Sequence, residues 1–138
     1  MSKHSILQEN KSYTFGSYFE LPYETEDIVA EFDYNFKRAK FSLPTSHRQL
    51  KGLPELRGRI EESLPLVSLS SEAARREVLI APVLLQVARY CQCRLRIEYP
   101  LNINERLKGN LDYLLQANSQ LLVIEAKNCL LYTSPSPR

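Results

Sequence analysis

Hydrophobic and polar residues alternate over residues 28–36, and this period-two pattern is typical of a half-buried strand. Three of the apolar positions are aromatic, and aromatic side chains favour strands. The apolar phase shifts at Ala39, which predicts a bulge or turn near Lys37 and Arg38. We therefore expect residues 1–52 to form an aromatic-rich N-terminal strand region.

The spacing then changes to that of amphipathic helices. Apolar residues at four-residue intervals predict a short helix over residues 53–67 that starts at Pro54. A longer helix is predicted over residues 72–90, preceded by serines that are suited to cap it. Its apolar positions cover more than one stripe, so we expect it to be mostly buried. Pro82 should kink it, because proline lacks a backbone N–H donor.

Three short runs of strand type follow, at residues 94–99, 111–116 and 120–127. Residues 117–119 have the composition of a turn, so the last two strands should form a hairpin. Helices followed by a meander of strands predict an α+β core.

The last strand carries an unusual combination of charge and hydrophobicity. Side chains alternate along a strand, so Glu125 and Lys127 project together from the end of a strongly apolar segment. If Asp112 faces the same way across the hairpin, two carboxylates and one ammonium group meet there. Burial costs several kcal/mol for each charge, which calls for a reason such as a metal site. A structural ion pair between Glu125 and Lys127 explains the short E-x-K pattern as well.

Phosphodiester hydrolysis uses such a set of residues. Two carboxylates can hold Mg²⁺ or Mn²⁺ and leave positions open for water and a phosphate oxygen. The metal lowers the pKa of bound water and neutralises charge on the phosphate. A lysine beside the second carboxylate can orient the water or stabilise the developing charge.

The segment LKGNLDYLLQANSQLLVIEAKN resembles the D…E-x-K region of the PD-(D/E)XK nuclease superfamily. It is especially similar to the N-terminal nuclease domain of type I restriction enzyme motor subunits, and Asp112, Glu125 and Lys127 match the catalytic positions. The upstream segment SEAARREVLIAPVL is similar to that family's helix pattern. An acidic residue on this helix often completes the metal site in the superfamily. The resemblance implies Glu72 for this role, or Glu77 as the alternative.

The resemblance implies a restriction-endonuclease-like core over residues 53–128, with a helix packed on a mixed, largely antiparallel sheet. The implied function is Mg²⁺- or Mn²⁺-dependent hydrolysis of DNA, in connection with restriction systems and their subunits. One alternative is an inactive relative that serves as a nucleic-acid-binding or protein-interaction module. The other is an unrelated α+β structural domain, in which Asp112 would not lie near Glu125.

Residues 129–138, CLLYTSPSPR, resemble the in-frame translation of a transposase-type sequencing adapter. A native Ser/Pro-rich tail is the alternative, but a match over ten consecutive codons favours the adapter. We therefore expect a C-terminally truncated core whose parent is a metal-dependent deoxyribonuclease. The fragment itself should be inactive, and its last strand should be poorly covered.

The composition excludes some classes of protein but does not indicate a function. The formal net charge is only +2, so any contact with nucleic acid needs a local basic patch. No apolar run is long enough to span a bilayer, and the first residues do not have the pattern of a signal peptide. The expected protein is cytoplasmic and has no membrane partner. There is no Walker lysine motif for an ATP-driven motor.

Overall fold

The computed structural model describes residues 5–126, which divide into two compact units. The first unit comprises residues 5–47 together with 100–110, and the second comprises 48–99 together with 111–126. The break after residue 47 lies close to the expected one after residue 52. The assignment of residues 100–110 to the first unit was not expected from the sequence.

The first unit contains a short 3-10 helix, η1 (Gly16–Glu20), and the helix α1 (Thr25–Ala30). The strand predicted over residues 28–36 is therefore wrong, and residues 34–47 form neither helix nor strand. Glu26 and Asp27 lie in the first turn of α1, where negative charge complements the helix dipole. Alternation alone was misleading because a strand also needs a neighbour to pair with.

Tyr13 forms the centre of the first unit, with only 3% of its surface exposed. Its ring stacks on Tyr18, whose hydroxyl donates to the carbonyl of Arg106 at 2.6 Å. The Tyr13 N–H donates to the carbonyl of Glu105 at 2.7 Å. A small aromatic core thus ties the N-terminal segment to residues 100–110.

The second unit contains both predicted helices. They comprise α2 (Leu53–Ser63), η2 (Leu64–Leu66), α3 (Glu72–Arg75), the π-helical turn η3 (Arg76–Ile80) and α4 (Ala81–Cys91). The Ser71 hydroxyl caps α3 by accepting the Ala74 N–H at 3.0 Å. A π-helical turn lies directly before Pro82, where the Ala81 N–H donates to the Arg76 carbonyl, and the expected kink at Pro82 stays a prediction.

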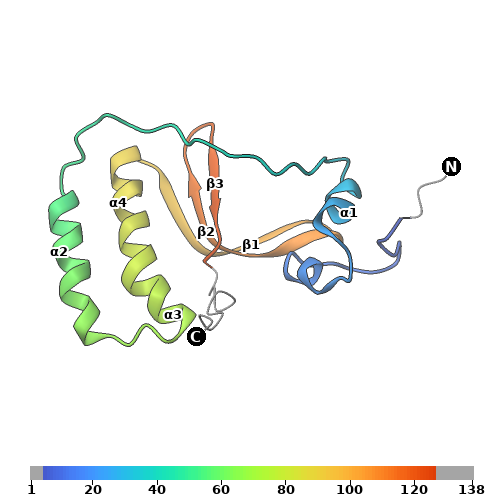
Figure 1. The fold of residues 1–138 in the computed structure, drawn as a ribbon, viewed down its shortest axis with the longest axis horizontal. Helices are drawn as coiled ribbons and strands as arrows, with labels where there is room; N and C mark the ends of the chain where they lie inside the picture. The colour runs from blue at the N-terminus through green and yellow to red at the C-terminus, as the bar shows by residue number, and fades with distance from the viewer. Residues whose placement is uncertain (1–4, 127–138) are drawn as a thin grey trace, which may run out of the picture. The chain divides into compact units, whose positions relative to one another are not determined.

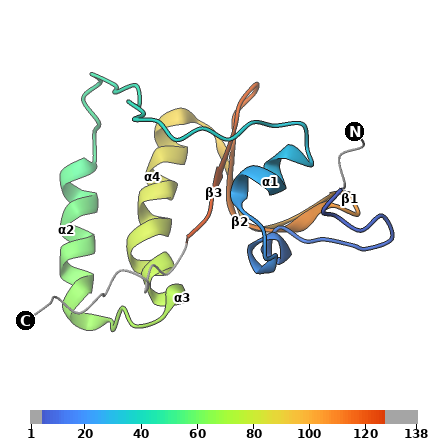
Figure 2. The same ribbon diagram turned by 45° about the vertical axis from the view of Figure 1, so that its right-hand side comes forward.

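Figures 1 and 2 show α2 and α4 side by side in the second unit. The expectation that the longer helix is mostly buried is wrong. No residue of α3, η3 or α4 is fully buried, and Val83 and Leu85 are 40% and 46% exposed. The apolar surface of this helix exceeds what α2 and the sheet cover.

The strands β1 (Arg94–Asn104), β2 (Leu107–Gln116) and β3 (Leu121–Ile124) form an antiparallel sheet in the order β1-β2-β3. The predicted hairpin is confirmed: Tyr113 pairs with Ile124, and Gln116 pairs with Leu121. The Ala117 N–H closes the turn by donating to the Gln120 carbonyl at 3.0 Å. The described chain is thus a small α+β fold, as the sequence predicted.

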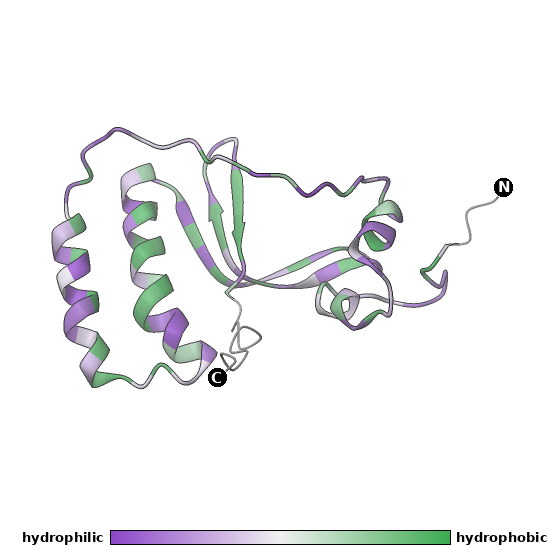
Figure 3. Ribbon diagram, viewed as in Figure 1, coloured by the Kyte–Doolittle hydropathy of each residue, from purple (hydrophilic) through white to green (hydrophobic). Residues whose placement is uncertain are grey.

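Burial in the second unit is concentrated on β2. The buried residues of this unit are Leu111, Tyr113, Leu114 and Leu115 on β2 and Ala126 after β3. In contrast, Leu121, Leu122 and Val123 of β3 are 67%, 57% and 48% exposed. Figure 3 shows the hydrophobic colour of β3. The expectation that the last strand is poorly covered is confirmed for these three residues, but it is wrong for Ala126, which is 5% exposed.

Candidate functional site

The hairpin register brings Asp112 and Glu125 together at one end of β2 and β3. Tyr113 pairs with Ile124 in an antiparallel register. The next residue outward is Asp112 on the first strand and Glu125 on the second, so the two lie opposite each other. The Ala126 N–H donates to Asp112 Oδ2 at 2.8 Å. The Asp112 N–H donates to Glu125 Oε1 at 3.4 Å, which is long for a hydrogen bond. The predicted approach of the two acidic residues is thus present.

A guanidinium group from η3 completes this cluster. Arg76 Nη1 lies 2.6 Å from Glu98 Oε1 and 3.8 Å from Asp112 Oδ1. The first distance is that of a charge-assisted hydrogen bond, and the second is an ion pair without a hydrogen bond. The side chains of Arg76 and Asp112 are only 17% and 15% exposed, whereas Glu98 is 56% exposed. Arg76 therefore neutralises part of the charge on two carboxylates.

Arg76 is held in place by the buried ring of Tyr113. Its guanidinium carbon lies 5.0 Å from the ring centroid, and its Nε donates to the Tyr113 hydroxyl at 3.4 Å. The hydrogen bond to Tyr113 is the main cause that raises the pKa of Arg76, and the bond to Glu98 is the next. The group therefore stays charged over the whole physiological range.

Glu98 reaches Arg76 from an unusual backbone conformation. Its φ of 50° lies in the left-handed region, which is uncommon for a residue other than glycine. Such a residue interrupts the regular alternation of side chains along β1. The acidic cluster with Asp112 and Glu125 thus contains a third carboxylate, although it joins through Arg76.

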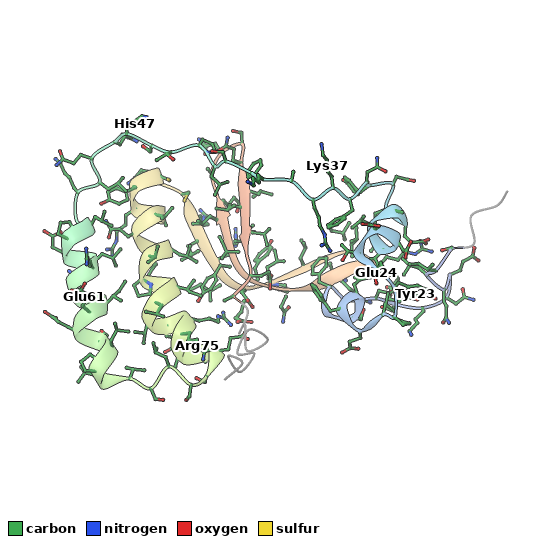
Figure 4. All side chains as sticks on the ribbon, viewed as in Figure 1. Tyr23, Glu24, Lys37, His47, Glu61 and Arg75 are labelled. Atoms are coloured by element: carbon green, nitrogen blue, oxygen red, sulfur yellow. The ribbon has the colours of Figure 1, made fainter. Side chains whose placement is uncertain are left out.

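The structure does not bring Glu72 or Glu77 into this cluster. Both side chains are exposed, and Glu77 lines a hollow of about 320 Å³ between α2 and α4. Within residues 5–126, no three acidic, histidine or cysteine side chains are placed to hold a metal ion. The third acid expected from the helix is thus replaced by Arg76. Figure 4 labels Arg75 on the same helix, the residue that ends α3 immediately before Arg76.

Sequence reasoning did not identify Arg76 as a neighbour of Asp112. Its position in the family-like helix pattern was the available signal, but the pattern does not say which side chain faces the hairpin. The π-helical turn adds a residue to one turn and so changes which side chains share a face. Lys127 and residues 129–138 lie outside the described residues, so their predicted roles stay predictions.

The chain was compared with protein families, curated proteins and solved structures, and nothing matches it. Over the described range, none of the helices is both long and apolar enough to cross a membrane. The relationship to the PD-(D/E)XK superfamily therefore stays a prediction that depends on the residues quoted for it.

Proposed function

We propose that the second unit is the metal-binding core of a nuclease domain of the PD-(D/E)XK type, which acts on DNA. The observation that carries the proposal is the meeting of Asp112 and Glu125 at one end of the β2–β3 hairpin, next to its buried apolar residues. A restriction-endonuclease-like core, a cytoplasmic restriction system and its partner subunits belong to the same proposal. They are supported by the resemblance alone.

The donor set fits a hard divalent cation. Asp112 and Glu125 would hold Mg²⁺ or Mn²⁺ through carboxylate oxygens, which such ions prefer. Each carboxylate oxygen has two lone pairs, so the bond from Ala126 to Asp112 Oδ2 leaves capacity for a metal. When bound, the ion would lower the pKa of a water ligand and neutralise charge on the phosphate. Lys127 is proposed to orient the attacking water.

Arg76 has a positioning role in this proposal. Its guanidinium attracts Asp112 Oδ1 at 3.8 Å, and the shorter bond to Glu98 fixes the guanidinium in place. Its partner Tyr113 is 2% exposed, so the Tyr113 ring is held by the packing around it and supports the Arg76 side chain. Arg76 thus keeps Asp112 aligned beside Glu125 in the absence of a metal.

A second candidate function is a binding module that takes no metal. It is favoured by the same guanidinium, which already supplies a positive charge at Asp112. Within residues 5–126 no third acidic, histidine or cysteine side chain is placed to share a metal ion with Asp112 and Glu125, which also favours it. In this case the two acidic residues would serve only to hold the hairpin end.

Metal binding separates the two candidates. Mn²⁺ bound by the chain can be counted by electron paramagnetic resonance, and DNA cleavage can be measured in the same samples. We expect saturable binding that Asp112→Asn removes, since the amide keeps an oxygen for the Ala126 N–H but loses the charge. Glu31→Gln in the first unit is the matched control and should leave binding unchanged. Equal binding by both variants would contradict a metal site at Asp112.

Where the complete active site is present, cleavage should require Mg²⁺ or Mn²⁺. Removal of a metal-holding carboxylate by Asp112→Ala or Glu125→Ala should then cost on the order of a hundredfold or more in rate. Lys127→Ala should lower the rate strongly as well. Full cleavage in excess chelator would contradict the proposed chemistry.

A further inference from the structure

A polar hollow of about 410 Å³ lies at the other end of the β2–β3 hairpin, in the second unit. It is lined by Gln92, Arg94, Arg96, Gln116, Ala117 and Asn118. Two guanidinium groups and three side-chain amides face it, and none of the lining residues is acidic. Figure 3 shows hydrophilic and hydrophobic colours alternating along β1 in this unit. This composition suits an anion.

The two arginines lie on one face of β1. Arg94 and Arg96 are two residues apart on β1, so their side chains share a face of the sheet. Arg96 Nε donates to Gln116 Oε1 at 3.3 Å, and its guanidinium lies 5.2 Å from the centroid of the Tyr99 ring. These contacts leave the terminal nitrogens of Arg96 available. Neither arginine forms an ion pair with any residue in 5–126.

The hollow lies on the same face of β2 as the candidate metal site. Asp112 and Gln116 are both even-numbered positions of one strand, and Gln116 bonds directly to Arg96. Four residues of strand separate them, which corresponds to about 13 Å. A nucleic-acid strand carries a phosphate at every nucleotide, so one strand can present a phosphate to each of the two sites.

We propose that Arg94 and Arg96 bind a backbone phosphate of the nucleic-acid strand whose scissile phosphate lies at Asp112 and Glu125. This inference rests on the proposed function, because it takes nucleic acid as the substrate. A guanidinium group donates two parallel hydrogen bonds to a phosphate, and Gln116 and Asn118 can donate further ones from their amides. The near-neutral chain would thus acquire its local basic patch here.

The test is DNA binding without metal, so that cleavage plays no part. Fluorescence anisotropy of a labelled duplex in excess chelator gives the affinity as a function of salt. The Arg94→Gln/Arg96→Gln double variant should bind more weakly, and the slope of log affinity against log salt should fall by about two. Arg94→Gln alone should lower it by about one, and within residues 5–126 it removes no hydrogen bond or ion pair. The double variant Arg57→Gln/Arg59→Gln on α2 removes the same charge elsewhere and should keep the slope.

The outcomes separate this inference from the proposed function. A slope that falls equally in both double variants, or in neither, overturns the phosphate site even if Mn²⁺ still binds at Asp112. A selective loss in the Arg94→Gln/Arg96→Gln variant supports the site. If Mn²⁺ binding is absent in that case, the nuclease proposal fails while the phosphate site stands, as a property of the binding module.

Discussion

Two carboxylates of this protein each hold a remote stretch of backbone, one in each unit. In the first unit, Glu31 accepts the Ser5 hydroxyl at 2.6 Å and the Ile6 N–H at 3.2 Å. In the second unit, Asp112 accepts the Ala126 N–H at 2.8 Å. The two carboxylates thus make the same kind of contact.

Their surroundings differ in a way that matters for function. The hydrogen-bond partners of Glu31 are neutral groups, and the charge of Arg106 is the smallest of the causes that lower its pKa. Asp112 has Glu125 beside it and the guanidinium of Arg76 in front of it. A carboxylate bonded to backbone is therefore no sign of chemistry by itself. The functional proposal depends on Glu125 and on Arg76, and each of these side chains can be removed separately by mutation.

The largest expected effect comes from the residue beneath the Asp112 cluster. Tyr113→Ala removes a side chain that is 2% exposed, and we expect the second unit to lose about 3–5 kcal/mol of stability. Hydrogen exchange of the β2 and β3 amides should speed up, while the Ile6 amide at Glu31 should be unaffected. Tyr113→Phe is the control, since it loses only the hydroxyl and should cost about 1 kcal/mol. Similar effects of the two variants would contradict this account of the ring.

The next largest effect comes from Arg76. Arg76→Met leaves Glu98 and Asp112 without their positive partner, so we expect a loss of about 1–3 kcal/mol of stability by urea unfolding. Arg57→Met is the control, because Arg57 forms an exposed ion pair with Glu61 and its removal should have no measurable effect. Indistinguishable midpoints for the two variants would show that Arg76 is as dispensable as a surface arginine.

The sequence predicted those parts of the fold that depend on local signals. The two helices of the second unit, the Ser71 cap and the β2–β3 hairpin follow from spacing, capping and turn chemistry within short windows. The approach of Asp112 to Glu125 could also be predicted, because a hairpin register fixes which side chains face each other. The outcome for residues 28–36 shows the limit. The pattern suited a strand, but α1 and an extended segment occupy these positions.

The composition of the site could be predicted only in part. Arg76 and Glu98 meet through a π-helical turn and a left-handed residue in β1, and neither feature has a reliable local signal. The same holds for the polar hollow, since Arg94 and Arg96 become one surface with Gln116 only once the sheet has formed. A site formed by residues far apart in the sequence can be predicted only when the packing that brings them together is known.

A smaller effect should come from metal binding. A ligand that binds only the folded chain stabilises it by about 1.4 kcal/mol at a concentration roughly tenfold above its Kd. Mg²⁺ should therefore raise the unfolding midpoint of the second unit. Asp112→Asn should abolish this rise, and Glu31→Gln should preserve it. If the rise in the unfolding midpoint survives Asp112→Asn, Mg²⁺ binds elsewhere. Asp112 would then not differ from Glu31 in metal binding.

The smallest effect tests the purely structural carboxylate by pH. The hydroxyl of Ser5 is the main cause that lowers the pKa of Glu31 below its ordinary value of 4.5, with help from the Ile6 amide. A lowered pKa in the folded state stabilises the protein above the unfolded value, and this contribution is lost as the pH falls through the folded value. We expect it to be about 1 kcal/mol or less, since the site is partly open to solvent.

Hydrogen exchange at Ile6, followed as the pH is lowered below 4.5, measures this contribution. The unaltered chain should lose protection there, after correction for the intrinsic exchange rate, whereas Glu31→Gln should begin with less protection and show no further loss from this group. Asp112→Asn is the matched control and should leave the Ile6 profile as it is. Parallel profiles for Glu31→Gln and the unaltered chain would mean that the charge of Glu31 contributes nothing. The bond from the backbone to Glu31 would then work equally well with a neutral acceptor, and the contrast with Asp112 would rest on Glu125 and Arg76 alone.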